Sequence, residues 1–196
     1  MKQYVVGVLA LQGAFAKHIE MLRTLGVHAK EVRKPEDLAS CDALIIPGGE
    51  STTMMKQMEF IQLFSPLQDF AKHKPVFGTC AGLILMSQEI VTESMRPFNL
   101  LDIAVERNAF GRQAESFQTE IDISFETGKH RPFPAVFIRA PRIRRTGEKV
   151  RILASYENEP VLVQQGRYLG ATFHPELTPD QTIHAHFLKI ISREHA

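Results

Sequence analysis

The chain has 196 residues, of which 44% are hydrophobic and 23% charged, values typical of a globular protein with a sizeable core. Its formal net charge of +1 gives no general reason to expect a nucleic-acid partner. No apolar run approaches the roughly 20 residues that span a bilayer, and no signal peptide is recognised, so we expect no membrane contact. Its two cysteines, Cys41 and Cys80, stand in unrelated contexts, which argues against disulfides and favours a reducing cytoplasm.

The first half of the chain predicts strands that alternate with helices. The helix expected over residues 14–25 illustrates the pattern, because Phe15, Ile19 and Leu22 recur on one face at near-helical spacing. Such alternation predicts a mostly parallel sheet with helices on both faces. The strands are expected at residues 4–10, 28–33, 43–46 and around 76, and the helices at residues 14–25, 35–39, 51–64, in a short segment ending near 72, and at 81–90.

The second half is richer in strands, so part of the sheet is expected to be antiparallel or extended by hairpins. After Pro179 a final helix directs Ile183, Phe187 and Ile190 inward. No repeat or linker divides the sequence, and we expect one α/β domain over residues 1–196, with a mixed, mostly parallel, flavodoxin-like sheet. These later strands are expected at residues 103–105, 117–123, 135–138, 150–155, 161–165 and 168–173.

A cysteine lies between glycines where a strand passes into a helix. The segment Gly78-Thr79-Cys80-Ala81-Gly82 has the G-x-C-x-G form of a nucleophile elbow, with cysteine where hydrolases carry serine. Glycines suit such a turn because strand and helix backbones approach closely there. The helix start favours thiolate over thiol. The alternative is a buried structural cysteine in a glycine-rich turn.

A histidine and a carboxylate follow the last predicted strand, in His174-Pro175-Glu176. Pro175 disfavours helical geometry at His174, so we expect an extended tripeptide. Residues two apart in an extended chain face the same way, and the Glu176 carboxylate can then orient the His174 ring. With Cys80 they supply a nucleophile, a base and an orienting group.

A glycine pair follows the buried strand at residues 43–46, in Pro47-Gly48-Gly49-Glu50-Ser51. Paired glycines leave backbone N–H groups uncovered, and such groups can stabilise a developing oxyanion. The alternative is an ordinary strand-to-helix turn with Ser51 as the N-cap of the next helix.

These three motifs, in this order, resemble the triad (class I) glutamine amidotransferase family over nearly the whole chain. The stretches at residues 105–113 and 136–141, with those at 11–14 and 174–178, narrow the resemblance to glutaminase subunits of pyridoxal 5′-phosphate synthase. One departure is Asn99, where a glycine is expected before the leucine pair. This departure affects the expected local turn and not the chemistry.

The resemblance implies that the chain hydrolyses L-glutamine to L-glutamate and ammonia through a thioester on Cys80, with His174 as acid and base and Glu176 as its partner. We expect the backbone N–H groups of Gly49 and Ala81 to form the oxyanion hole. The resemblance assigns the glutamine contacts to Gly49, Glu50, Ser51, Arg107, Ile138 and Arg139.

Because no further domain is predicted that could use ammonia, its acceptor should lie on another protein. The resemblance implies the synthase subunit of pyridoxal 5′-phosphate synthase, in a hetero-oligomer built on a dodecameric core. Three alternatives stay open: an acceptor enzyme of an imidazole or purine pathway, a cysteine peptidase or esterase, and an inactive binding module. We expect slow hydrolysis alone and activation by the synthase, since a Gly48–Gly49 peptide can flip at low cost.

Histidines and arginines are the remaining residues that could bind a metal or a partner. The eight histidines do not form a ligand pattern, since His184 and His186 are two apart in a predicted helix, so we expect no metal and no other cofactor. The basic run formed by Arg139, Arg142, Arg144 and Arg145 predicts a solvated face, with a partner-docking surface as the alternative.

Overall fold

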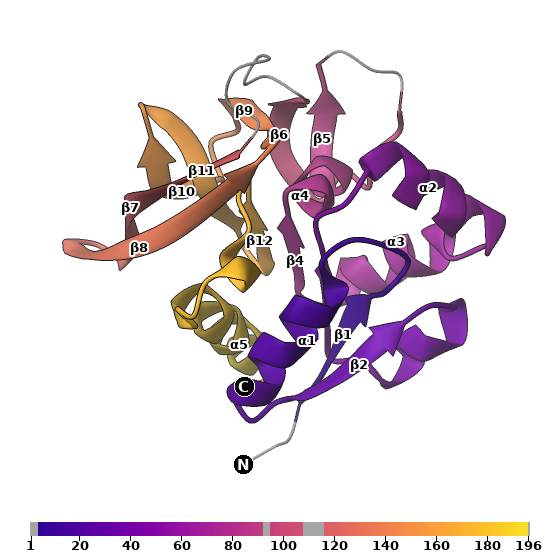
Figure 1. Cartoon of the computed structure of the whole chain (residues 1–196). Coiled ribbons are helices and arrows are strands. Elements are labelled where there is room, and N and C mark those ends of the chain that lie inside the picture. Colours follow the sequence, from indigo (N-terminus) through magenta and orange to yellow (C-terminus); the bar gives the residue numbers. More distant parts are fainter. Residues whose placement is uncertain (1–3, 92–94, 108–115, 196) are drawn as a thin grey trace.

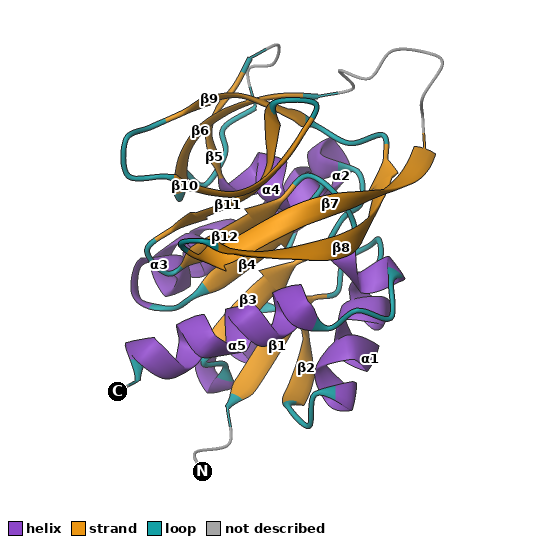
Figure 2. Ribbon diagram, turned by 90° about the vertical axis from the view of Figure 1, so that its left-hand side faces the viewer, coloured by secondary structure: helices purple, strands orange, loops and turns teal. Residues whose placement is uncertain are grey.

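A computed structural model gives the fold of the chain and describes residues 4–91, 95–107 and 116–195 (Figure 1). Residues 108–113, part of a stretch that narrows the resemblance, lie outside the described residues. A mixed sheet runs through the molecule with helices on both faces, which confirms the predicted fold class (Figure 2).

The strands described in one half of the main sheet are parallel. Strand β3 (Ala43–Ile46) is buried over its whole length, and its side chains alternate between the apolar clusters on the two faces. The sequence of a strand covered on both faces is a continuous run of apolar residues, so sequence alone predicts this strand. The order is β2 (His28–Val32), β1 (Val5–Leu9), β3, β4 (Val76–Thr79) and β12 (Tyr168–Ala171).

The other half of the main sheet is antiparallel, as expected. Its longest strands, β7 and β8, form a hairpin whose tip projects to the left in Figure 1. From β12 outward the order is β11 (Glu159–Gln165), β10 (Arg151–Tyr156), β7 (Ser116–Glu126) and β8 (Lys129–Ile138). A smaller sheet, which the sequence does not predict, contains β5 (Ser87–Ile90), β6 (Leu101–Glu106) and β9 (Arg142–Thr146).

Helices cover both faces of the parallel half. On one face lie α1 (Phe15–Thr24) and α5 (Thr182–Glu194), with the predicted inward residues of α5 buried (Figure 2). Because each helix presents an apolar stripe to the sheet, the core forms two layers, one on each side of it. The opposite face carries the 3₁₀ helix η1 (Pro35–Ser40), α2 (Ser51–Phe60), α3 (Phe64–His73) and α4 (Ala81–Met86).

The helix predicted over residues 81–90 is wrong in its second half, where the chain forms β5. The hydroxyl of Ser87 donates to the Ile84 carbonyl at 2.7 Å, and the N–H of Leu100 donates to the Met86 carbonyl at 2.9 Å. These bonds take the carbonyls that a longer helix would use. One of them comes from a segment beyond the helix, so the local apolar pattern does not reveal the helix end.

The helix predicted over residues 51–64 also ends early, at Phe60. Gln62 has φ = 58°, a left-handed conformation that ends the helix. A second helix, α3, then begins at Phe64. Pro66 lies in its first turn, where a missing N–H has no helical partner to lose.

Asn99 occupies the turn where the resemblance predicts glycine, and it has φ = 57°. Asparagine is one of the few residues with a side chain that tolerate this left-handed region. The turn therefore forms without glycine.

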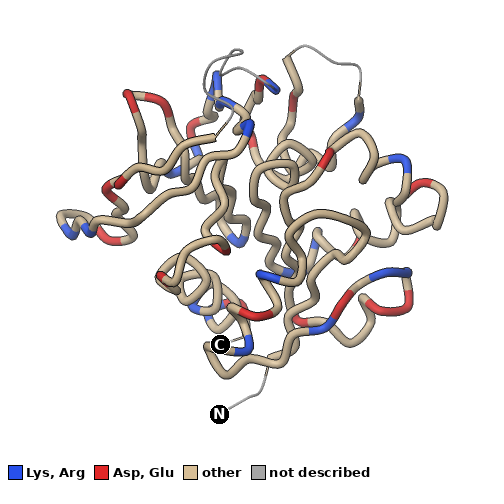
Figure 3. The backbone as a smooth tube through the Cα atoms, in the orientation of Figure 1, with Lys and Arg blue, Asp and Glu red and all other residues tan. Residues whose placement is uncertain are grey.

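Three arginines of the basic run lie in strand β9, a strand that the sequence does not predict, whereas Arg139 precedes it. Arg144 Nη1 lies 2.9 Å from Glu159 Oε1, and Arg145 Nη1 lies 2.7 Å from Asp102 Oδ1. These pairs are partly exposed, as predicted for a solvated face. Figure 3 shows acidic and basic segments interspersed around the molecule, so this run adds little net charge to the surface.

Candidate active site

Loops that follow β1, β3, β4 and β12 meet at the carboxyl edge of the parallel strands and line a pocket of about 390 Å³. This edge is where ligands bind in open α/β sheets. Every residue that the sequence analysis proposes for the site lines the pocket except Glu176, which lies behind His174.

Cys80 occupies the turn between β4 and α4 with φ = 50° and ψ = −106°, a conformation rare for residues with a side chain. Its N–H donates to the Ala171 carbonyl at 2.9 Å, and its carbonyl accepts from the Ile84 N–H at 3.2 Å. Backbone strain of this kind persists only where the surrounding structure holds the residue in place, and strained residues cluster at functional sites. The geometry is that of a nucleophile elbow, with the sulfur at the pocket.

Two glycines make the elbow possible by allowing backbones to touch. A Cβ at Gly82 would lie 1.9 Å from the Ile46 carbonyl oxygen on β3. A Cβ at Gly78 would lie 2.6 Å from the backbone of Gly82. Both distances are well inside van der Waals contact, so the close approach that the sequence motif predicts is present.

His174 follows β12 and is anchored by its N–H, which donates to the Val136 carbonyl at 2.8 Å. Its Nδ1 lies 2.7 Å from Glu176 Oε1, and both side chains are buried. The expectation of an extended tripeptide is wrong, because Pro175–Leu177 forms a 3₁₀ turn, η2. The turn nevertheless brings the carboxylate back to the imidazole.

The surroundings of His174 favour its charged form. Burial alone would lower its pKa, but hydrogen bonds with Cys80 and Glu176 outweigh burial and raise the pKa of His174 to about 10. For Glu176, burial would raise the pKa, while His18 and His174 together lower it below its usual value. The imidazolium lies beside the Cys80 sulfur, where it can donate a proton to a leaving group. The arrangement can therefore supply both a nucleophile and a proton donor.

The glycine pair packs against the histidine. A Cβ at Gly48 would lie 2.3 Å from Cε1 of His174, so a larger residue there would displace the imidazole. The Gly48 carbonyl accepts a long hydrogen bond, 3.4 Å, from the Ala14 N–H. Gly49 and Ala81 lie on the wall of the pocket near Cys80.

Glu50, and not Ser51, is the N-cap of α2, so that alternative assignment is wrong. Its carboxylate accepts from the N–H groups of Thr52 and Thr53 at 3.1 and 2.7 Å and pairs with Arg107 Nη2 at 2.9 Å. Burial would raise the pKa of Glu50, but the hydrogen bonds from Thr53 and Thr52 lower it to about 2. Arg107 is thereby fixed at the pocket rim.

Ser51, Ile138 and Arg139 complete the predicted set. The Ser51 side chain is buried, and within the described residues its hydroxyl has no hydrogen-bond partner. Cys80 Sγ lies 3.8 Å from the Ile138 carbonyl, and Arg139 has φ = 42°, a strained conformation beside the pocket. A buried hydroxyl without a partner on the pocket wall is available to a ligand.

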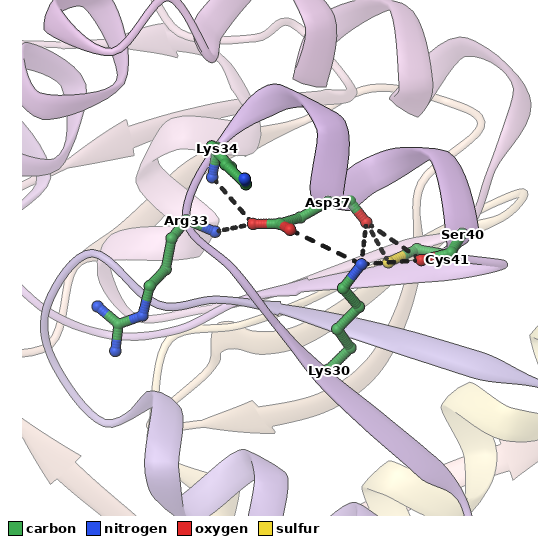
Figure 4. Close-up of polar contacts among 6 residues, drawn as sticks. All are labelled: Lys30, Arg33, Lys34, Asp37, Ser40 and Cys41. Atoms are coloured by element: carbon green, nitrogen blue, oxygen red, sulfur yellow. Dashed lines mark hydrogen bonds and ion pairs between the residues drawn. The ribbon is translucent and has the colours of Figure 1, made fainter.

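Cys41, unlike Cys80, has no histidine beside it among the described residues and does not line the active-site pocket. Its Sγ donates to the Asp37 carbonyl at 3.3 Å, in a cluster with Lys30 and Ser40 (Figure 4). Burial raises the pKa of the Cys41 thiol. A protonated, buried thiol is a poor nucleophile, so a structural role suits Cys41.

Sequence reasoning missed the residues behind Glu176. His18 of α1 and His184 of α5 are fully buried and in contact, with His18 Nδ1 lying 2.9 Å from His184 Nε2. His18 Nε2 lies 3.2 Å from Thr79 Oγ1 and 3.4 Å from Glu176 Oε2. A signal was present, since His18 stands three residues after Phe15 and therefore on the buried face of its helix.

His186 faces away from this cluster, as its spacing from His184 predicts. Its Nε2 lies 2.9 Å from Gln164 Oε1, and its ring stacks on Phe125. Among the described residues no group of three His, Cys, Asp or Glu side chains is arranged to hold a metal ion. No helix in the described ranges is long and apolar enough to cross a membrane.

Comparisons with known proteins show which family the chain matches. The SNO glutamine amidotransferase family matches residues 8–193. A protein of Desulforamulus reducens named "Pyridoxal 5′-phosphate synthase subunit PdxT" is 53% identical, covering 95% of this chain and 99% of its own. A protein of the same name from Thermosipho africanus is 48% identical, covering 96% and 99%.

Solved structures agree with the sequence comparisons. A crystal structure described as a glutamine amidotransferase superposes with a TM-score of 0.88 at 46% identity and covers 95% of this chain and 98% of its own. A protein from Thermoplasma acidophilum described as part of a GMP synthase, at 16% identity and a TM-score of 0.73, covers 100% and 97% and shares the fold alone. With most of its length matched by the family and by close relatives, the chain belongs to the SNO glutamine amidotransferase family.

Proposed function

We propose that the chain is the glutaminase subunit of a pyridoxal 5′-phosphate synthase and that Cys80, His174 and Glu176 perform its chemistry. The observation that carries the proposal is the pocket itself. A strained cysteine, a carboxylate-bound histidine and a glycine pair converge at one sheet edge, in a chain whose relatives are named as subunits of that synthase.

The first half-reaction forms a thioester. The Cys80 thiolate attacks the carboxamide carbon of glutamine, and the N–H groups of Gly49 and Ala81 stabilise the oxyanion of the tetrahedral intermediate. His174 then donates a proton to the amide nitrogen as the C–N bond breaks. Ammonia leaves, and a glutamyl thioester remains on Cys80. The raised pKa of His174 suits this role, because it supplies the imidazolium at neutral pH.

The second half-reaction returns the enzyme to its starting state. Neutral His174 takes a proton from water, whose oxygen attacks the thioester carbonyl, and the same N–H groups hold the new oxyanion. The C–S bond breaks, glutamate leaves, and the Cys80 thiolate again faces a histidinium. Throughout, Glu176 keeps the Nδ1–H of His174 in place and stabilises the ring's positive charge.

Recognition of glutamine falls to the predicted residues on the pocket wall. The unpartnered Ser51 hydroxyl can bind the polar end of the substrate, and Glu50 and Arg107 offer groups of opposite charge for its amino and carboxylate ends. The backbone at Ile138 and Arg139 borders the sulfur and limits how the substrate lies.

Ammonia made here needs an acceptor close by, because at neutral pH free ammonia is mostly protonated and lost as a nucleophile. The synthase subunit supplies that acceptor, in a cytoplasmic hetero-oligomer on a dodecameric synthase core. Docking switches the glutaminase on through the glycine pair. Gln12 Nε2 donates to the Glu50 carbonyl at 2.7 Å and Ala14 N–H donates to the Gly48 carbonyl, so a partner that moves residues 12–14 would reorient the Gly48–Gly49 peptide.

The test is reconstitution with the synthase subunit, together with the other substrates of that synthase. Pyridoxal 5′-phosphate should form from glutamine only when this chain is present, and ammonium salt should replace both the chain and glutamine. Binding to, and glutamine-dependent activation of, an imidazole- or purine-pathway synthase in place of this one would assign a different acceptor. Failure to release glutamate with any partner would reject the glutaminase function.

A further inference from the structure

His18 faces Glu176 at the oxygen that His174 does not use, and two further buried residues, Thr79 and His184, contact His18. His18 comes from α1, Thr79 from β4 and His184 from α5, and none of the three is exposed to solvent. Glu176 Oε1 is bound by His174, whereas Oε2 is buried and has no hydrogen bond within the described residues. His18 Nε2 lies 3.4 Å from that Oε2.

The contacts select one arrangement of protons. Glu176 is an acceptor when ionised, so the facing His18 Nε2 must carry a proton that lies between Glu176 Oε2 and Thr79 Oγ1. A neutral His18 then has a bare Nδ1, which accepts from His184 Nε2–H at 2.9 Å. His184 Nδ1 is left as an acceptor without a partner in the described residues, which costs less than a buried donor without one.

We infer that His18 is a positioning residue for the glutaminase reaction: its Nε2–H faces the second oxygen of Glu176 at 3.4 Å and stabilises that oxygen electrostatically, so that the first oxygen stays aligned with the His174 ring. The inference rests on the proposed glutaminase function. His18 touches neither glutamine nor Cys80 on this account, and His184 acts one step further away by fixing which nitrogen of His18 carries the proton.

The need for a second donor follows from burial. A carboxylate removed from water is stable only if its oxygens face donors, and one imidazole can serve only one of them. Loss of the second donor would favour protonation of Glu176 or its rotation away from His174. The titratable groups that face the carboxylate are His18 from α1, His184 from α5 and His174 beside it, with Cys80 beyond that ring.

The charge states agree with this arrangement. Burial lowers the pKa of His18, an effect that the nearby Glu176 carboxylate offsets only in part, and His174 lowers it further. Burial, with a smaller contribution from His18, lowers the pKa of His184 to about 3. Both rings are therefore neutral at pH 7 and act through their N–H groups.

The experiment compares His18→Leu with His18→Gln, each with the synthase bound and thermal unfolding measured first. Leucine fills the space without a donor, so kcat should fall about tenfold to a hundredfold, by analogy with the loss when a residue that orients a metal ligand is removed. KM should hardly change. The acid limb of the pH–kcat/KM profile should move to higher pH, because Glu176 without its donor takes up a proton more readily.

Glutamine at this position keeps an N–H near the place of Nε2 and should restore part of kcat. The matched control is His186→Gln, a buried histidine on α5 that contacts Gln164 instead, and its kcat and pH profile should equal those of the wild type. Folded His18→Leu with wild-type kcat and an unmoved acid limb would overturn the inference.

A second measurement does not depend on turnover or on a variant that folds. In wild-type protein with ¹⁵N-labelled histidine, His18 should appear at pH 7 as the neutral tautomer with its proton on Nε2. A charged His18, or a proton on Nδ1, would contradict the inference even if the protein is an active glutaminase. If His18 shows the expected tautomer but the protein has no glutaminase activity, the contact is supported and the proposed function has failed.

Discussion

Cys80 and His174 of the proposed triad are each anchored by a backbone hydrogen bond to another strand. The Cys80 N–H donates to the Ala171 carbonyl on β12, and the His174 N–H donates to the Val136 carbonyl on β8. Because the anchors are backbone groups of the sheet, the functional atoms depend little on flexible side chains. Such support is what a preorganised site requires.

The roles of His174 and Glu176 can be separated by substitution. His174→Asn removes the acid and base, and turnover should fall by about a hundredfold to ten-thousandfold. Glu176→Gln keeps the shape of the side chain but loses its charge, so turnover should be strongly impaired yet measurable. Steady-state glutamate release from pH 5 to pH 10 measures both. If Glu176→Gln matches the wild type over this whole range, the carboxylate has only a structural role.

At this scale the sequence identifies most residues that border the pocket and Glu176 behind His174, but not the histidines behind Glu176. Cys80, the glycine pair and His174 each follow a predicted strand, and carboxyl ends of parallel strands share one edge of a sheet. His18 and His184 are found only in the structure. A histidine on the buried face of a helix is compatible with many partners, and sequence spacing cannot choose among them.

At the scale of elements, apolar runs and periodicity predict the parallel half of the sheet and the helices that flank it. They do not predict the end of α4 or strand β9. N–H groups within residues 98–100 donate to the last carbonyls of α4. Strand β9 forms by pairing with β6, and its arginines form ion pairs with acidic side chains of β6. Both outcomes depend on segments distant in sequence, whereas propensity reports only on neighbours.

The close contact of α4 with β3 can be tested at Gly82. Gly82→Ala places a Cβ against the Ile46 carbonyl oxygen, and overpacking of this kind should lower the free energy of unfolding by about 3 kcal/mol. The control Gly26→Ala meets no atom within 4 Å and should lose about 1–2 kcal/mol, from its positive φ alone. Urea denaturation measures both. A Gly82→Ala variant that loses no more than Gly26→Ala would refute this packing.

For the whole molecule, the proposed switch predicts that glutaminase activity depends on assembly. At saturating glutamine, glutamate production should be slow for the chain alone and at least about a hundredfold faster with the synthase, the value of one oxyanion donor. Gln12→Ala removes the hydrogen bond from Gln12 to the Glu50 carbonyl, which helps to fix the glycine loop. It should therefore reduce the difference in turnover between the chain alone and the chain bound to the synthase. Equal turnover with and without the synthase would reject the switch but leave the glutaminase assignment intact.

The buried histidine pair predicts how stability depends on pH. The pKa of His184 is about 3 in the folded protein and near 6.5 when unfolded, so below pH 6.5 the unfolded chain takes up a proton that the folded chain does not. The stabilisation is complete above pH 6.5 and falls by about 1.4 kcal/mol per pH unit as the pH decreases towards 3.

Urea denaturation at pH 7, 6 and 5 measures this slope. His184→Asn should reduce the slope of unfolding free energy against pH by the contribution of about one proton. His130→Asn, a substitution at an exposed position, should leave the slope unchanged. The comparison uses slopes, because His184→Asn also alters the contact with His18. An unchanged slope in His184→Asn would contradict the charge state assigned to the cluster.

The central claim is that glutamine is hydrolysed through a thioester on Cys80, and one measurement tests it most directly. Glutamate release is followed for the wild type and for Cys80→Ala, each bound to the synthase at saturating glutamine. The account predicts steady turnover by the wild type and none above background by Cys80→Ala, with the variant still folded and still bound, since one small side chain replaces another. Substantial glutamate release by Cys80→Ala would contradict it.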